Sequence, residues 1–273
     1  MDQVLNVECG QDDILYRIQK ACGDKKRVVY VTVTNADAIP EDDRTYGPSA
    51  IAQLRKLKEW NDSWTTLLVH KNDDKGIWCQ KDISRPDTVP QETLRKAYPI
   101  HDIFSLSVTR EVKSRVSEVF YDGQIAFLKI ARFSHEIPWV IQELRAYHAL
   151  AESTLAPKLI AYVSEPSPDR VIGFLVQRID GRNAELNDLE PCRQALDQLH
   201  CHLIHGDPCK YNIFITPEGP KFIDFEDSIL IGTERWNTTL RDEEKQVLAT
   251  KLADTSGAGR PWLQYRTNSS TNL

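Results

Sequence analysis

The stretch from Leu203 to Ser228 reads LIHGDPCKYNIFITPEGPKFIDFEDS and gathers ionisable and polar side chains between apolar runs. The apolar runs are typical of two short strands, and TPEG between them is a turn-forming sequence. Buried carboxylates cost free energy unless a partner compensates them. We therefore expect the polar residues of this stretch to serve a function beside a hairpin.

Closing this hairpin brings Asn212 and Asp224 side by side. Side-chain oxygens of Asn and Asp are ligands that Mg²⁺ prefers, together with phosphate oxygens and water. Asp207, five residues before Asn212, is not needed as a ligand and can accept the proton of an attacking hydroxyl. Lys210 either steadies a transferred phosphoryl group or lies in solvent. The pattern predicts a phosphoryl-transfer site.

Upstream of this stretch, from about Ser105, three antiparallel strands are predicted in SLSVTREV, SEVFYDG and QIAFLKIA, with Asp122-Gly123 as a tight turn. A helix is predicted in PWVIQELRAYHALAE, two further strands in KLIAYVSE and RVIGFLVQRI, and a second helix in LEPCRQALDQLHCHL. This mixture of strands and helices predicts an α+β domain that ends in the acidic hairpin.

Lys129 is a lysine within the apolar strand AFLKIA, and Glu143 follows fourteen residues later on the predicted helix. Taken alone, a strand lysine usually lies at a sheet edge or extends into solvent, and a helical glutamate is usually solvated. Glu136 competes with Glu143 for the same place. The order and spacing relative to the downstream motif favour a lysine that contacts phosphates and a glutamate that holds it.

The pattern H-G-D-x-x-x-x-N followed by I-D-F-E, at His205 to Asn212 and Ile223 to Glu226, resembles the protein-kinase-like branch that includes aminoglycoside phosphotransferases and choline kinases. The chain is most similar to short fungal kinase-like proteins, most of which have no assigned substrate. The resemblance covers roughly residues 105–260. It implies a bilobal kinase-like fold with a reduced C-terminal lobe, and ATP and Mg²⁺ as cofactors.

The resemblance also implies roles for individual residues. His205 resembles a structural histidine rather than a chemical participant. The hinge that holds adenine through its backbone would run from Gln177 to Ile179. The resemblance makes Asp207 the catalytic base, and Asn212 and Asp224 the metal ligands. It makes Lys129 the lysine that contacts the phosphates and Glu143 the partner of that lysine.

Three departures from protein kinases affect the expected function. No glycine lies between Gly76 and Gly123, so the glycine-rich loop is absent, and Lys113 and Arg115 could supply charge to phosphates instead. Glu226 stands where protein kinases have glycine. Only 49 residues follow Asp224, with a single predicted helix in RDEEKQVLATKLADT, so we expect little room for a subdomain that grips a peptide.

Three hypotheses follow. The leading one is an ATP- and Mg²⁺-dependent phosphotransferase that acts on a hydroxyl acceptor, with a small molecule favoured. The alternatives are a minimal atypical serine/threonine protein kinase and a catalytically silent kinase-like module that binds nucleotide or acts as a scaffold. In this fold, loops and the helices after the catalytic hairpin determine which acceptor is bound, and here they contain no recognisable motif.

Residues 1–104 are predicted to form a small α+β extension of unknown role. DDILYRIQKAC and PSAIAQLRKLKEW predict helices, RVVYVTVT predicts a strand, and SWTTLLVH with KGIWCQ predicts a hairpin. The polar stretch KDISRPDTVPQE, with two prolines, is the best boundary region. The kinase-like domain is predicted at 105–260, followed by a polar tail at 261–273 that we expect to be disordered.

Composition narrows the class of protein. Hydrophobic residues make up 41% of the 273 residues, which is enough for a sizeable core. The net charge of −6 gives no broad cationic face for nucleic acid, and no long apolar run indicates a membrane span or export. Six scattered cysteines without a C-x-x-C pair argue against a zinc site or a disulfide framework. We expect a cytoplasmic location, and nothing in the sequence indicates an oligomeric state.

Overall fold

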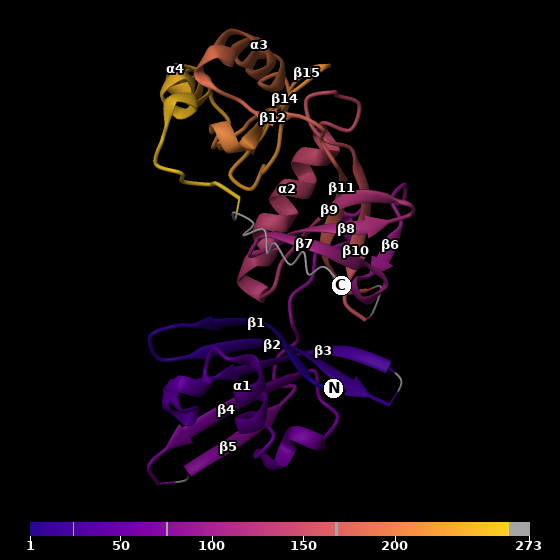
Figure 1. Ribbon diagram of the computed structural model, residues 1–273, viewed down its shortest axis with the longest axis vertical. Coiled ribbons are helices and arrows are strands. Elements are labelled where there is room, and N and C mark those ends of the chain that lie inside the picture. The colour runs from indigo at the N-terminus through magenta and orange to yellow at the C-terminus, as the bar shows by residue number, and fades with distance from the viewer. Residues whose placement is uncertain (24, 75, 167–168, 262–273) are drawn as a thin grey trace, which may run out of the picture. The chain divides into compact units, whose positions relative to one another are not determined.

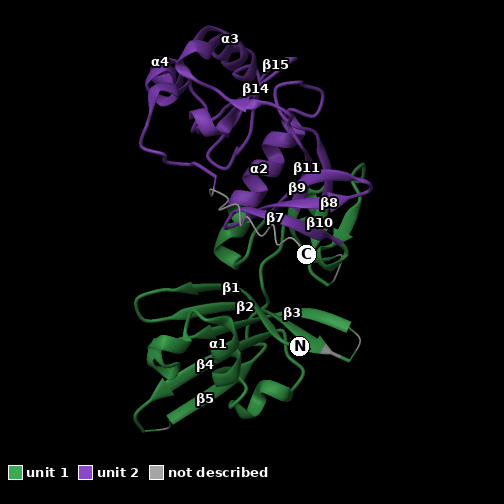
Figure 2. Ribbon diagram, viewed as in Figure 1, with its two compact units in different colours: residues 1–105, 130–138, 162–173 green, residues 106–129, 139–161, 174–273 purple. Residues whose placement is uncertain are grey.

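The computed structural model describes residues 1–23, 25–74, 76–166 and 169–261 (Figure 1). The tail predicted at 261–273 lies outside the described residues except for Pro261. The chain divides into two compact units, one of residues 1–105, 130–138 and 162–173, the other of residues 106–129, 139–161 and 174–273 (Figure 2). The predicted domain boundary at residue 104/105 stays a prediction, and each unit is described by itself.

The first unit is built around a five-stranded sheet in the order β1-β2-β3-β4-β5. All neighbours pair antiparallel except β3 and β4, which are parallel. The parallel pair needs a crossover connection, and this connection contains helix α1. The bounds are β1 Gln3–Cys9, β2 Ile14–Cys22, β3 Lys25–Val33, α1 Gly47–Leu54, β4 Thr66–Asn72 and β5 Gly76–Lys81.

The helix predicted in residues 12–22 is wrong, because this segment is strand β2. Ile14, Tyr16 and Ile18 are fully buried and belong to a hydrophobic core cluster, together with Trp60 and Trp64. Alternate residues point to opposite faces of a strand, so apolar side chains at every second position fill one face. The buried apolar residues of this segment recur with a period of two, as in a strand, and not with the period of a helix.

The strands predicted from residue 105 onward are confirmed. They belong to a six-stranded sheet in the order β6-β10-β11-β9-β8-β7. The turn between β8 and β9 has positive φ at both central residues, 47° at Asp122 and 76° at Gly123, as a tight hairpin requires. The bounds are β6 Ile100–Asp102, β7 Ser107–Lys113, β8 Val116–Tyr121, β9 Gln124–Ile130, β10 Leu159–Ser164 and β11 Val171–Gln177.

The predicted helices and the acidic hairpin are also present. The helices are α2 Ile137–Ala149, α3 Leu189–Leu199 and α4 Thr238–Ala253. The hairpin is β14 Ile213–Thr216 with β15 Gly219–Phe222, joined by β12 Arg182–Asn183, and β13 Leu203–Ile204 pairs with β16 Ile229–Leu230. Helix α4 begins earlier than predicted because the Asn237 side chain accepts a hydrogen bond from the Leu240 amide.

Short 3₁₀ turns connect these elements, at Ala36–Ala38, Glu41–Asp43, Lys58–Asn61, Gln91–Thr93, Ile103–Ser105, Ser134–Glu136, Leu186–Asp188 and Lys210–Asn212. The α+β class predicted from the sequence is confirmed. Within the described residues, none of the helices is both long and apolar enough to cross a membrane. The five cysteines whose side chains are described are all free thiols.

Candidate functional site

The second unit contains a cavity of about 340 Å³. Cavities of this size that combine apolar walls with a few polar groups are typical of small-molecule sites. Gln177 and Ile179, the predicted hinge residues, line it. So do the apolar Phe127, Phe174, Val176 and Phe214 and the charged Lys113, Lys129, Glu143 and Asp224.

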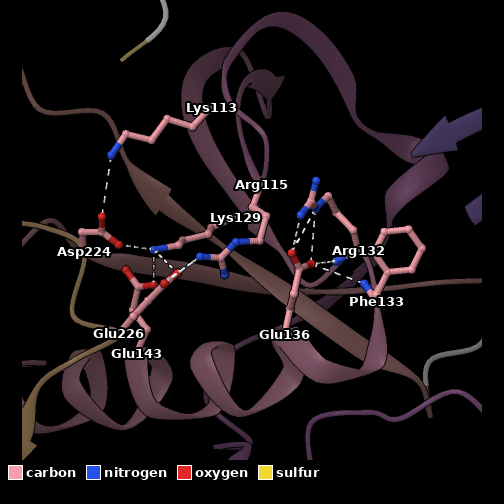
Figure 3. Close-up of polar contacts among 9 residues, drawn as sticks. All are labelled: Lys113, Arg115, Lys129, Arg132, Phe133, Glu136, Glu143, Asp224 and Glu226. Carbon is pink, nitrogen blue, oxygen red and sulfur yellow. Dashed lines mark hydrogen bonds and ion pairs between the residues drawn. The ribbon is translucent and has the colours of Figure 1, made fainter. Parts of the chain in front are cut away.

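Lys129 lies at the centre of the charged part of the site (Figure 3). Its Nζ lies 2.6 Å from a Glu143 oxygen, 2.5 Å from Asp224 Oδ1 and 2.7 Å from Glu226 Oε1. Burial opposes the charged form of Lys129, but the three carboxylates outweigh it and raise the pKa of this lysine. One ammonium thus holds together side chains from strand β9, helix α2 and the segment after β15.

Glu143 is almost completely buried and shares its lysine with two other carboxylates. Burial raises the pKa of Glu143 to about 7, and the charges of Asp224 and Glu226 act in the same direction against that of Lys129. Glu136, the competing glutamate, instead accepts hydrogen bonds from the backbone and guanidinium of Arg132 (Figure 3). The predicted pairing of Lys129 with Glu143 is therefore present as a contact.

Asp224 has a left-handed backbone conformation, with φ of 66°. For a residue other than glycine this conformation costs roughly 1–3 kcal/mol and tends to occur at functional sites. The next residue, Phe225, is fully buried, with its ring 5.4 Å from that of Tyr147 and 5.1 Å from that of His205. Burial opposes ionisation of Asp224, but Lys129 dominates and lowers the pKa of this carboxyl to about 2.

Two cations stand at the turn between β7 and β8, where protein kinases have a glycine-rich loop. Lys113 Nζ lies 3.8 Å from Asp224 Oδ2, and Arg115 Nη2 lies 2.6 Å from Glu226 (Figure 3). The Arg115 guanidinium also lies over the Trp139 ring, 4.9 Å from its centroid. This turn therefore presents positive charge beside Asp224 without glycine.

The segment from His205 to Asn212, hereafter the HGD loop, is held by hydrogen bonds. The buried His205 ring bonds Ile223 O at 3.0 Å through Nε2 and accepts from the Asp207 amide at 3.3 Å through Nδ1. Burial lowers the pKa of His205, so the neutral ring suits both contacts. Gly206 has φ of +91°, and a Cβ there would lie 2.5 Å from Asp227 O, so no larger residue fits.

Asn212 lies at the end of the HGD loop and is buried. Its Nδ2 donates to Asp207 O at 3.0 Å and to Asp207 Oδ2 at 3.3 Å. The Ile223 amide donates to Asn212 O at 3.0 Å, which brings Asn212 to the strand end that Asp224 follows, as predicted.

Asn212 Oδ1 is buried and has no hydrogen-bond partner among the described residues. Buried acceptors are normally satisfied, and a hard cation is one group that would satisfy this oxygen beside the Asp224 carboxylate. The chemistry of Asn212 and Asp224 therefore fits Mg²⁺. The carboxylates of Glu143, Asp224 and Glu226 also lie within 4.8 Å of one another, but the Lys129 ammonium already contacts all three.

The model of the RIO domain matches residues 109–250, just over half of the chain. The chain belongs to the RIO domain family. This is an atypical protein-kinase-like family, so the kinase-like bilobal fold predicted from the sequence is confirmed. The finer assignment to the branch of aminoglycoside phosphotransferases and choline kinases stays a prediction.

In this RIO domain Lys210 contacts the end of α4, and its contact with a phosphoryl group stays a prediction. Its Nζ donates to the main-chain oxygen of Asp254, just past the end of α4, and lies 5.2 Å from the centroid of the Tyr211 ring. The ammonium that contacts the Asp207 carboxylate belongs to Lys251, at 2.7 Å. The two alternatives predicted for Lys210, a phosphoryl contact or solvent, did not include this contact with α4.

Sequence reasoning also missed Glu244 of the RIO domain. This buried α4 residue accepts hydrogen bonds from the amides of His205 at 3.1 Å and Gly206 at 2.6 Å, and bonds the His200 ring at 2.7 Å. Burial raises the pKa of Glu244, but these donors outweigh it and lower the pKa overall. The signal that could have found both α4 residues is their spacing, since Glu244, Leu248 and Lys251 share one helix face.

Proposed function

We propose that this protein is an ATP- and Mg²⁺-dependent phosphotransferase of the atypical protein kinase type, which transfers the γ-phosphoryl group to a serine or threonine hydroxyl. The observation that carries the proposal is the network of Lys129 with Glu143, Asp224 and Glu226 beside the HGD loop. Lys129, Glu143 and Asp224 of this network line one cavity. Phosphoryl transfer needs positioned cations and an oriented hydroxyl more than covalent chemistry.

Each residue of the site would have a separate role in binding ATP or in the transfer. The apolar wall of the cavity and the backbone from Gln177 to Ile179 would bind the adenine, and Lys129 would bind the phosphates while Glu143 holds its side chain. Asp207 would orient the acceptor hydroxyl and accept its proton. Asn212 and Asp224 would hold Mg²⁺, which when bound neutralises phosphate charge. Lys113 and Arg115 would replace the glycine-rich loop as phosphate contacts.

The family match supports a protein acceptor over the small-molecule acceptor that the sequence favoured, because the RIO family is protein-kinase-like. The small-molecule hypothesis rested on the few residues after the hairpin. The two acceptor classes differ in a direct assay, in which labelled ATP is offered with dephosphorylated casein or with choline and kanamycin. We expect label on the protein acceptor, and label on choline or kanamycin instead would restore the first hypothesis.

Nucleotide binding is tested by thermal unfolding with ATP, with and without Mg²⁺. A ligand at a hundred times its Kd stabilises the folded state by about 2.7 kcal/mol, so binding is visible. Asp224→Asn should remove the Mg²⁺-dependent part, and Asp242→Asn, on an exposed position of α4, should not. Asp207→Asn should keep nucleotide binding and lose turnover by about a hundredfold or more. Absence of any Mg²⁺-dependent shift in the wild type would favour the catalytically silent alternative.

A further inference from the structure

Helix α4 presents one face to the HGD loop. Glu244, Leu248 and Lys251 are spaced by four and three residues, which places them on the same side of a helix. Leu248 is fully buried, and the Glu244 carboxylate binds the amides of His205 and Gly206. The first residue of this face thus holds the backbone of the HGD loop, and Lys251 follows two turns later.

Lys251 contacts the HGD loop at the carboxylate of Asp207. Its Nζ lies 2.7 Å from Asp207 Oδ1, while the other carboxylate oxygen faces the Asn212 amide at 3.3 Å. The hydrogen bond to Asp207 is the main cause of a raised pKa at Lys251, so this lysine stays charged. About 40% of the Asp207 side chain and 44% of the Lys251 side chain remain exposed. The pair is therefore accessible to an incoming hydroxyl.

The end of α4 is fastened to the loop by a second contact. Lys210 of the loop donates to Asp254 O, one residue past the helix. Gly259 lies close to the loop as well, since a Cβ at this glycine would lie 3.7 Å from Cys209 Sγ and 3.8 Å from the Tyr211 ring. The loop lysine thus contacts the end of the helix, and the helix lysine contacts the loop carboxylate.

We propose that Lys251 is a catalytic residue, whose ammonium holds Asp207 and contacts the phosphoryl group during its transfer. The inference rests on the proposed function. In the step it serves, the acceptor oxygen forms a bond to the γ-phosphorus and the bond from that phosphorus to the β,γ-bridging oxygen breaks. ADP leaves with the electron pair, and the hydroxyl proton passes to Asp207. Lys251 gives up no proton.

The chemistry of an ammonium suits this task. It carries three donors, so a hydrogen bond to Asp207 leaves two for the phosphoryl oxygens. Negative charge on those oxygens must be stabilised during transfer, and positioned cations are the usual means. The pair contributes little to folding, because an exposed ion pair gains little over its hydration. A loss of turnover on removing Lys251 would therefore not reflect a loss of structure.

The test compares full-length Lys251→Met and Lys251→Arg with a matched control, Lys245→Met. Lys245 lies on the same helix and is also paired with an aspartate, Asp197, at 2.5 Å, but has no contact with the HGD loop among those described. The measurements are unfolding temperature, affinity for Mg²⁺·ADP, the gain in that affinity on adding aluminium fluoride, and turnover of ATP with water as acceptor. Aluminium fluoride occupies the place of the transferred phosphoryl group.

We expect Lys251→Met to keep its unfolding temperature, its affinity for Mg²⁺·ADP and the KM for ATP. It should lose the gain from aluminium fluoride and about a hundredfold in kcat, the scale seen when one charge-stabilising donor is removed. Lys251→Arg should recover part of the gain from aluminium fluoride and part of kcat. Lys245→Met should match the wild type in all of these measurements.

If aluminium fluoride raises the affinity of Lys251→Met for Mg²⁺·ADP as much as that of the wild type, the inference is overturned and the proposed function is not. Unchanged or increased kcat would also overturn it, and an increase would mean that Lys251 competes with the acceptor for Asp207. A wild-type protein that binds no Mg²⁺·ADP would contradict the proposed function and the inference together. The nucleotide measurement therefore separates the two failures.

Discussion

Glu165 is the buried centre of an ion-pair network in the first unit, and its replacement by glutamine should strongly destabilise the protein. Its Oε1 accepts from Arg17 Nε at 2.6 Å, and its Oε2 accepts from the Tyr30 hydroxyl at 2.5 Å and from Arg170. The exposed side-chain fraction is 0% for Glu165 and 4% for Arg17. Arg17 lies on β2, whereas Glu165 lies between β10 and β11.

The magnitude follows from burial. Removing one partner of a buried ion pair leaves an uncompensated charge and costs about 3–5 kcal/mol. Glu165→Gln removes the carboxylate charge that both guanidinium groups contact, so the loss should fall in this range. For a domain of 150 to 250 residues, about 1 kcal/mol corresponds to roughly 2–4 °C in Tm, which gives a fall of about 6 °C or more. This loss is a large part of an ordinary folding free energy of about 5–15 kcal/mol.

The assay is urea unfolding of Glu165→Gln, Arg17→Met and the double variant. The double variant should lose less free energy of unfolding than the sum of the single losses, because both remove the same contact. Glu152→Gln, at an exposed glutamate after α2, is the matched control and should change the free energy by no more than about 0.5 kcal/mol. A loss below about 1 kcal/mol for Glu165→Gln, or additive losses, would refute the idea that β2 folds together with residues 162–173.

Two further predictions concern the candidate site. The pKa of Glu143 rises from 4.5 to about 7 on folding, so the folded state binds the extra proton between these values and stability falls as pH rises through this window. Glu143→Gln has no carboxyl group at this position and so lacks this loss of stability. The Tm of the variant relative to that of the wild type should therefore rise between about pH 5 and pH 7. Parallel profiles of Tm against pH would show that the pKa of Glu143 is not raised. Gly206→Ala should lose more than about 2 kcal/mol in urea unfolding, since the left-handed conformation costs about 1–2 kcal/mol and the new Cβ meets Asp227 O. Gly232→Ala, with φ of +83° and nothing within 4 Å of its Cβ, should show the conformational part alone, and equal losses at both glycines would disprove the steric argument.

Local patterns in the sequence were enough to predict most of the second unit. The turn at Asp122-Gly123, the period of α2 and the TPEG hairpin are each encoded within a few residues, because turn geometry and side-chain periodicity are local properties. The HGD loop and the I-D-F-E motif together indicated that Asn212 lies near Asp207 and near the strand end that Asp224 follows. Local patterns do not distinguish helix from strand at β2, because a short amphipathic segment fits both periods.

The partners of the charged side chains were decided by tertiary structure. Lys129 and Asp224 are separated by 95 residues, Asp207 and Lys251 by 44, and Arg17 and Glu165 by 148. A pattern of neighbouring residues contains no information on which distant carboxylate reaches a given cation, since that depends on how strands and helices pack. The sequence by itself therefore determined the elements, the hairpin and the acidic motif. Only the packing decided that Lys129 serves three carboxylates and that the cation beside Asp207 comes from α4.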